Sequence, residues 1–252
     1  MTQSRQLEAE VANAGSTGRD DHDIFRLAPS MDTAVLETIA TRLEFRGTDE
    51  GYARRSQAYF ARLPLAQARR LTAQEGLSGN VTYQVADAHH APHGDAEFDI
   101  VILHTLISHV DDPPQVLAEA RRLVRPGGTV AIFDGDYASL TFAHPDHALA
   151  TTIEEKLIQL MVANPRIMRD LPRLVREAGL ELVEADGTLY ANIGSSRFWV
   201  AATESYGGLL GRSGLLPQTV VDDWRAFQVQ AVADNTFFGA SNYYTYLTRR
   251  PE

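Results

Sequence analysis

Residues 98–134 constrain the fold of this chain more than any other stretch. They begin with FDIVILHTL, a near-continuous apolar run typical of a strand buried on both faces of a parallel sheet. Two aspartates and two prolines follow at 111–114, the composition expected where a helix begins. We predict that this helix reaches Leu123, that RPGG forms a turn, and that TVAIFDG forms the next strand. Strand, helix and strand in this order predict a parallel pair with a helical crossover.

The rest of the chain continues this alternation of strands and helices. Alternating apolar residues in NVTYQVADA predict a strand over 80–88, and HHAPHGDAEF reads as a polar loop. After residue 136 we predict an irregular stretch. The remaining predicted elements are helices over 148–162 and 164–179, a strand over 181–193, a helical insertion at about 196–234, and a final strand over 237–250. This order predicts an α/β fold with a doubly wound, mostly parallel sheet.

The first third of the chain divides into a tail and a helical region. Residues 1–22 are polar and contain Gly and Ser, so we expect a flexible N-terminal tail. Apolar residues at helical spacing predict three helices within residues 23–75. Residues 76–252 then make up the α/β domain, with the helical insertion inside it.

Charge and composition exclude several classes of protein. The formal net charge is −10 and no basic run is present, so nucleic acid is not an expected partner, since binding to phosphates depends on Lys and Arg. The chain has no cysteine, which excludes disulfides and cysteine nucleophiles. The N-terminus lacks the apolar core of a signal peptide, and no apolar run approaches the roughly 18 residues of a membrane span. We therefore expect a cytoplasmic protein with no membrane partner.

An ordered series of short motifs runs from residue 81 to the C-terminus. It consists of Asp-Ala at 87–88, FD at 98–99, HVDDP at 109–113, the PGG turn at 126–128, and then LPRLVREAGL and FFGASNYYTYLTRR. Taken together, these motifs resemble class I S-adenosylmethionine-dependent methyltransferases of the ubiquinone/menaquinone type, from about residue 52 onward. The resemblance implies a Rossmann-like methyltransferase fold, S-adenosylmethionine as the cofactor, and a small-molecule acceptor.

One part of the family pattern is missing from this chain. The family has a strand followed by a glycine-rich DxGxGxG loop, and its next strand ends in an acidic residue that binds the ribose hydroxyls. Here the roughly 20 residues between Phe60 and Val81 are too few for a βαβ unit, which takes about 30 or more. Loss of a central strand and its neighbour would expose strand edges. We therefore hypothesise a rearranged sheet or a domain-swapped homodimer.

The resemblance implies two pairs of cofactor-binding residues at strand ends. Asp87 and Ala88 match the position beside the adenine ring, where the carboxylate accepts a hydrogen bond from the exocyclic amine. His104 and Thr105 end the next strand, at the carboxyl edge where doubly wound sheets bind ligands. The alternatives are a solvated Asp at a strand end and a histidine with a purely structural role.

Two further segments are candidates for covering the site. Tyr52 and Arg55 lie on a helix that resembles the family's N-terminal lid, and Arg55 there could bind the methionine carboxylate of the cofactor. A surface role for the arginine is the alternative. The insertion holds several aromatic residues that would form either a hydrophobic lid or ordinary helix packing: Phe198, Trp199, Tyr206, Trp224 and Phe227.

Three residues are candidates for the chemistry itself. His104 could face the substrate from the end of its strand. Asp134 and Asp136 follow the strand TVAIF, in a loop that faces the acceptor in the family, and either could act as a general base. Capping of the loop by these aspartates is the alternative.

The histidine-rich loop does not predict a metal site. His89, His90 and His93 lie close together, but they lack the paired ligand spacing that metal sites require. His109, in HVDDP, is interpreted as a residue that positions the loop before the helix.

Two functions from different classes fit the sequence. The first is an S-adenosylmethionine-dependent methyltransferase acting on a small molecule. The second is a protein that keeps the methyltransferase fold but has lost cofactor binding, either a non-catalytic binding protein or a cofactor-free, cyclase-like enzyme. The missing glycine-rich loop favours the second, and the otherwise intact series of motifs favours the first.

Overall fold

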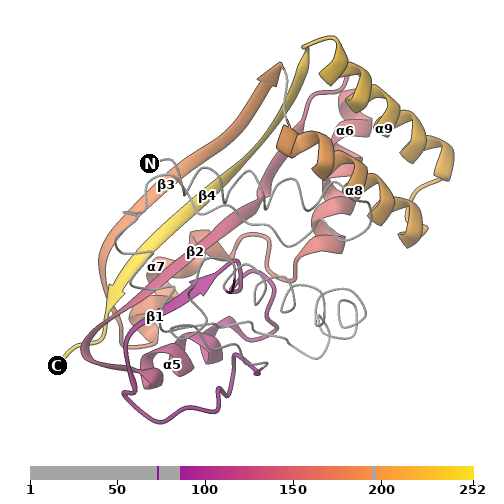
Figure 1. The fold of residues 1–252 in the computed structure, drawn as a ribbon. Coiled ribbons are helices and arrows are strands. Elements are labelled where there is room, and N and C mark those ends of the chain that lie inside the picture. Colours follow the sequence, from indigo (N-terminus) through magenta and orange to yellow (C-terminus); the bar gives the residue numbers. More distant parts are fainter. Residues whose placement is uncertain (1–72, 74–85, 195–196) are drawn as a thin grey trace. The chain divides into compact units, whose positions relative to one another are not determined.

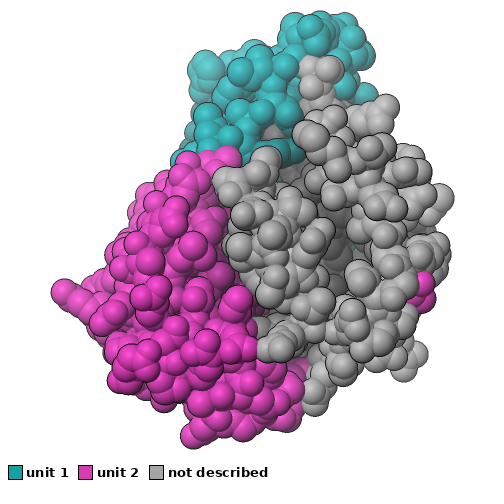
Figure 2. Space-filling view, turned by 60° about the vertical axis from the view of Figure 1, so that its left-hand side comes forward, with its two compact units in different colours: residues 1–26, 137–162, 189–242 teal, residues 27–136, 163–188, 243–252 magenta. Residues whose placement is uncertain are grey.

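A computed structural model describes residue 73, residues 86–194 and residues 197–252 of the chain. The chain divides into two compact units, which are coloured separately in Figure 2. Unit 1 includes residues 137–162 and 189–242, and unit 2 includes residues 86–136, 163–188 and 243–252. The tail, the N-terminal helices, the boundaries at 22 and 75, and most of the strand predicted over 80–88 lie outside the described residues.

The strands of the described residues form one four-stranded sheet in the order β1-β2-β4-β3 (Figure 1). The strands are β1 (Phe98–His104), β2 (Val124–Phe142), β3 (Glu181–Gly194) and β4 (Phe237–Arg249). β1 and β2 are parallel, with Ile100 opposite Thr129 and His104 opposite Phe133. The predicted strand–helix–strand unit with a parallel pair is therefore confirmed.

The direction of β4 makes the described sheet a mixed one. At one end, the Arg250 backbone N–H donates to the Gly128 carbonyl at 3.0 Å, and at the other end the Ala143 N–H donates to the Phe238 carbonyl at 3.0 Å. This pairing is antiparallel, because the residue numbers rise on one strand as they fall on the other. The α/β class is confirmed, and the parallel pairing in the described residues is that of β1 with β2.

β2 differs from the prediction at both of its ends. The RPGG segment is not a separate turn but an irregularity inside β2, where the register with β1 shifts. Gly128 is required there because a Cβ would lie 2.7 Å from the Asp99 carbonyl oxygen. The stretch after Asp136, predicted to be irregular, continues as strand to Phe142. This prediction was wrong because the pairing of residues 137–142 is with β4, about 100 residues away along the chain.

Helix α5 (Pro113–Leu123) begins as its sequence predicts. The Asp112 carboxylate accepts a hydrogen bond from the Gln115 backbone N–H, and prolines fill the first helical positions, which lack intrahelical donors in any case. Arg121 and Arg122 lie in the last turn, where positive charge is favourable.

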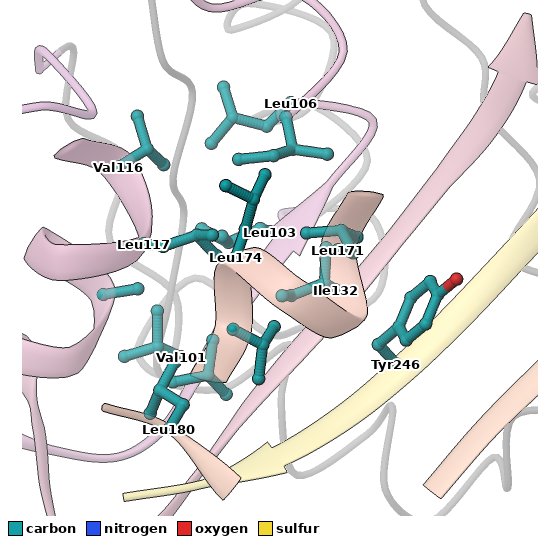
Figure 3. Close-up of a cluster of buried hydrophobic side chains, with 14 of the residues drawn as sticks. Val101, Leu103, Leu106, Val116, Leu117, Ile132, Leu171, Leu174, Leu180 and Tyr246 are labelled. Carbon is teal, nitrogen blue, oxygen red and sulfur yellow. The ribbon is translucent and has the colours of Figure 1, made fainter. Parts of the chain in front are cut away.

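Unit 2 has a core between its strands and the helices α5 and α7 (Ile167–Glu177), which Figure 3 shows in close-up. Val101 and Leu103 of β1 and Ile132 of β2 face Leu117 of α5 and Leu171 of α7, and all five side chains are at most 1 % exposed. Burial of each such side chain contributes roughly 1.5–3 kcal/mol. The alternation of buried and half-buried residues along β1 shows that one of its faces is the more deeply buried.

Helix α7 contains Pro172 in its interior. A proline has no N–H, so the carbonyl four residues earlier, that of Met168, loses its normal helical donor. The buried Tyr246 hydroxyl of β4 donates a hydrogen bond to this carbonyl at 2.7 Å. A side chain from the last strand thus replaces the bond that the proline removes. Gly179, with φ of +73°, follows the end of the helix, as predicted.

Unit 1 has its own core, built on three helices. These are α6 (His147–Met161), α8 (Arg197–Ser213) and α9 (Gln218–Ala233), with α8 in contact with both of the others. Trp224 of α9 is fully buried, and its ring meets that of Phe142 edge to face at 5.6 Å. Helices α8 and α9 cover most of the range of the predicted helical insertion, about 196–234. Among the described residues, no helix is both long and apolar enough to cross a membrane.

Candidate active site

The carboxyl end of β1 and the neighbouring part of β2 bring four of the predicted residues to one edge of the parallel pair in unit 2. Because the strands are parallel and His104 lies opposite Phe133, Thr105 and Asp134 follow at the same level. Asp136 lies two residues further along β2. This edge is where parallel α/β sheets bind ligands, so these residues share the location that a catalytic or cofactor role requires.

A row of aromatic rings crosses three strands at this level. The His104 ring lies 4.9 Å from that of Phe133, which stacks on Tyr243 of β4 at 5.6 Å with an angle of 12° between the planes. Phe133, the central ring of the row, is only 6 % exposed, so the row is largely buried beside the end of β1. Nothing local in the sequence marks Phe133 and Tyr243 as neighbours, because only the pairing of β2 with β4 brings them together.

Burial lowers the pKa of His104 to about 4. The imidazole is therefore neutral at pH 7. A general base works best with a pKa near the operating pH, so His104 is poorly matched to that role. A neutral ring is suited to lying beside a positively charged group, since it adds no repulsion.

Thr105 holds the chain in an unusual conformation just after β1. Its φ is +47°, a left-handed value that costs a non-glycine residue energy, and such strain clusters at functional sites. Its backbone N–H donates to the Phe133 carbonyl at 2.7 Å, and its hydroxyl donates to the His104 carbonyl at 2.8 Å. The first residue of the loop is therefore fixed to both strands.

Asp134 is completely buried and holds the loop that follows β1 in place through hydrogen bonds. Its carboxylate accepts hydrogen bonds from the Ser108 backbone N–H at 3.0 Å and from the Gly135 N–H at 2.8 Å. Burial raises the pKa of Asp134, and the charge of His109 and these donors oppose the rise. Both oxygens are occupied by backbone donors, so the carboxylate positions the loop.

The same loop is held from a second side by Asn164. The Asn164 backbone N–H donates to the Ser108 carbonyl at 2.9 Å, and its side-chain amide donates to the Val110 carbonyl at 2.6 Å. Asn164 precedes α7, far from the loop in sequence. Loop residues 105–110 are thus fixed by β2 and by the segment before α7.

Asp136 forms a two-pronged ion pair with Arg169 of α7. The guanidinium donates to both carboxylate oxygens at 2.7–3.1 Å, and the side chain of Asp136 is 2 % exposed whereas that of Arg169 is 49 % exposed. Such paired geometry is among the stronger interactions of an arginine. The carboxylate predicted as a general base thus lies buried against a cation and links α7 to β2.

Asp87 is the one predicted carboxylate that is open to solvent, with its side chain 51 % exposed. It follows Ala86, a residue in an isolated β-bridge, and precedes Ala88, which is 2 % exposed. Its Oδ1 atom accepts two hydrogen bonds from His89, from the backbone N–H at 2.9 Å and from ring Nδ1 at 2.7 Å. Among the described residues, no hydrogen bond is made to Oδ2.

The loop that carries His89, His90 and His93 is bound to α5 by a network of ion pairs and hydrogen bonds around Arg122. Arg122 donates to both oxygens of Glu119, to Asp95 and to the carbonyls of Ala91 and His93, at 2.7–3.3 Å. The hydrogen bond from Arg122 is the main reason that the pKa of Glu119 is lowered. Within the described residues no group of ligand-type side chains could hold a metal ion.

Several predicted residues cannot be placed at the site. Tyr52 and Arg55 lie outside the described residues, as do the side chains of Phe198 and Trp199. Tyr206 and Trp224 both pack on Phe142 inside the core of unit 1, which favours helix packing over a lid for these two.

Comparison with known proteins gives a family match. Residues 60–132 match the model of a methyltransferase domain. Over 128 residues the chain is 34 % identical to the methyltransferase GfsG of Streptomyces halstedii, covering 50 % of this chain and 44 % of that protein. Over 121 residues it is 33 % identical to the ubiquinone biosynthesis O-methyltransferase of Thiobacillus denitrificans, covering 44 % of this chain and 49 % of that protein.

These matches are partial in extent. The chain spans less than half the length of these relatives. Among solved structures, the YcgJ protein of Bacillus subtilis aligns with 77 % of this chain and 81 % of its own chain, with a TM-score of 0.48 and 13 % sequence identity, which is a weak similarity. The two named relatives are methyltransferases and give no support to the loss of cofactor binding. Residues 60–132 thus carry a methyltransferase domain signature, and the resemblance of this chain to class I S-adenosylmethionine-dependent methyltransferases is confirmed.

Proposed function

We propose that this protein transfers the methyl group of S-adenosylmethionine to a small-molecule acceptor. The observation that carries the proposal is the match of residues 60–132 to a methyltransferase domain, whose strand-end carboxylate Asp87 is exposed and pre-oriented. The matched relatives support a small molecule, as one is named for ubiquinone biosynthesis. The net charge of −10 argues against a nucleic-acid acceptor.

The residues at the adenine end of the proposed site fit the cofactor. Asp87 is half exposed and offers Oδ2 as an acceptor, which suits an exocyclic amine. His104 and Thr105 would lie nearer the methionine end, where a neutral imidazole tolerates a sulfonium. When bound, the cofactor supplies an activated methyl group that the acceptor's nucleophile takes as the carbon–sulfur bond breaks. Tyr52 and Arg55 remain proposed contacts for the methionine end.

The buried aspartates are proposed to position the site instead of accepting a proton. Asp134 holds residues 105–110, and Asp136 holds α7 through Arg169. Catalysis would then rest on placing the acceptor in line with the methyl group and excluding water from the reacting atoms. A cytoplasmic location and a homodimer are further parts of the proposal.

Calorimetric titration with S-adenosylmethionine and S-adenosylhomocysteine tests the function directly. We expect micromolar binding by the folded protein, and binding about tenfold weaker or worse after Asp87→Ala, because the adenine amine loses a charged acceptor. Asp111→Ala is the matched control, since Asp111 is likewise an exposed aspartate and lies outside the helices and strands, two residues before α5. Absence of binding by a folded, wild-type sample of confirmed mass would contradict the proposal.

A further inference from the structure

Asp87 and His89 are joined by two hydrogen bonds, one from the backbone and one from the ring of His89. The backbone bond alone would close the turn, so the ring bond calls for a separate explanation. Both hydrogen bonds from His89 converge on one oxygen, Oδ1, and no described residue donates to the other oxygen, Oδ2. The side chain of His89 is 14 % exposed, whereas that of Asp87 is 51 % exposed. The histidine is thus the buried support and the carboxylate the presented group.

His89 is itself held in place by its surroundings. Gln115 of α5 donates from its side chain to the His89 carbonyl at 3.3 Å. Ala91, two residues after His89, donates a hydrogen bond from its backbone N–H to the Glu119 carboxylate of α5 at 2.8 Å. The His89 Nε2 atom is buried and has no hydrogen-bond partner within the described part of the chain, so the polar contact of the ring there is with Asp87. The loop cannot shift freely without breaking these bonds to α5.

The charge state of the pair supports this direction of bonding. Burial raises the pKa of Asp87, but the backbone and ring hydrogen bonds from His89, with the charges of His89 and His90, outweigh it and lower the pKa overall. An ionised carboxylate only accepts, so Nδ1 must carry the proton and donate. Oδ2, to which no described residue donates, can then serve as a charged acceptor.

We propose that His89 is a positioning residue for cofactor recognition, which orients the Asp87 carboxylate so that Oδ2 reads the exocyclic amine of the adenine ring. This inference rests on the proposed function. His89 selects an adenine base over a base that presents an oxygen at the same place, because an oriented carboxylate attracts a donor and repels an acceptor. His89 would not touch the reacting atoms.

The test compares the affinities of two ligands whose bases differ at the 6-position, an amine in one and an oxygen in the other, and in the proton that the oxo base carries on the adjacent N1. Dissociation constants for S-adenosylhomocysteine and S-inosylhomocysteine are measured by calorimetry on the wild-type chain and on His89→Ala. We expect His89→Ala to reduce the preference for the adenine form roughly fivefold to tenfold, the effect of losing one charge-assisted hydrogen bond. The backbone bond to Oδ1 survives in this variant, so folding is expected to survive too.

Two control variants separate positioning from general damage to the loop. His89→Asn places an amide N–H where Nδ1 lies and should restore most of the preference. His90→Ala alters the exposed neighbour, whose side chain acts on Asp87 through charge alone, and keeps the backbone N–H that donates to the Asp87 carbonyl at 3.1 Å; it should change the preference much less than His89→Ala does. Equal weakening of both ligands by His89→Ala would overturn the proposal, as would an unchanged preference.

A measurement without ligand distinguishes this inference from the proposed function. Carboxyl-carbon NMR titration of the apo protein should show that the pKa of Asp87 rises in His89→Ala, since its donors are reduced. An unchanged pKa would overturn the orienting role even if the cofactor binds. Failure of the wild-type chain to bind S-adenosylhomocysteine would instead overturn the proposed function, and the recognition role of His89 with it.

Discussion

At the residue scale, the three aspartates that were predicted to follow strands differ in what their carboxylates contact. Asp87 is half exposed and leaves one oxygen unused by the described residues. Asp134 and Asp136 are at most 1 % exposed and are bound by backbone donors and by an arginine, respectively. The sequence predicts a site role for all three because each comes just after a predicted strand. It could not separate them, because burial and the donors from residues 108 and 169 come from segments distant in the chain.

Asp134→Ala should destabilise the protein by about 2–4 kcal/mol. The substitution leaves the buried Ser108 and Gly135 N–H groups without acceptors, and each such group costs about 1–3 kcal/mol. Urea denaturation followed by circular dichroism measures the change. Asp111→Ala, at an exposed position, should stay within about 0.5 kcal/mol of wild type. Similar stability of the two variants would show that Asp134 does not clamp the loop.

At the scale of elements, boundaries that depend on local signals agree with the sequence, and those that depend on pairing do not. Helix α5 begins at its Asp112 cap and α7 is followed by Gly179, both as predicted. β2 extends to Phe142 and includes the PGG segment that was predicted to be a turn, because the strand is hydrogen-bonded to β1 and β4. Pro172 in α7 would suggest a helix break, yet the helix continues, because Tyr246 bonds the carbonyl that the proline leaves free.

The link between Pro172 and Tyr246 predicts a non-additive pair of substitutions. Tyr246→Phe should cost about 1–2 kcal/mol of unfolding free energy, because the buried Met168 carbonyl loses its donor. In a Pro172→Ala background, the new Ala N–H at position 172 can donate to that carbonyl, so the same substitution should cost much less. Urea denaturation of the four proteins of this double-mutant cycle gives the coupling. Equal costs in both backgrounds would refute the compensation.

At the scale of the whole molecule, two separate cores account for the buried side chains. The core of unit 2 lies among β1, β2, α5 and α7, and the proposed site residues belong to this unit. The core of unit 1 lies among α6, α8 and α9 and buries Trp224. The aromatic residues of the insertion are therefore explained, where the structure describes their side chains, by the packing of unit 1.

Trp224→Ala tests whether this helix is core or lid. We expect a loss of about 3–5 kcal/mol, because a fully buried aromatic side chain leaves a large cavity. Val229→Ala on the same helix α9, at a side chain that is 47 % exposed, should change stability by no more than about 0.5 kcal/mol. Thermal or urea unfolding compares them. A small loss for Trp224→Ala would favour a mobile lid over a packed helix.

The sequence by itself determined the α/β class, the parallel strand–helix–strand unit, the helix limits at Asp112 and Gly179, and the family resemblance. These follow from periodicity, caps and motifs, which act over a few residues and are written locally in the chain. The tertiary structure decided the length of β2, the mixed sheet and the aromatic row through Phe133 and Tyr243. It also decided that Asp87 is exposed whereas Asp134 and Asp136 are buried. Those features depend on which distant segments meet, and burial and hydrogen bonding act between them only after the chain has folded.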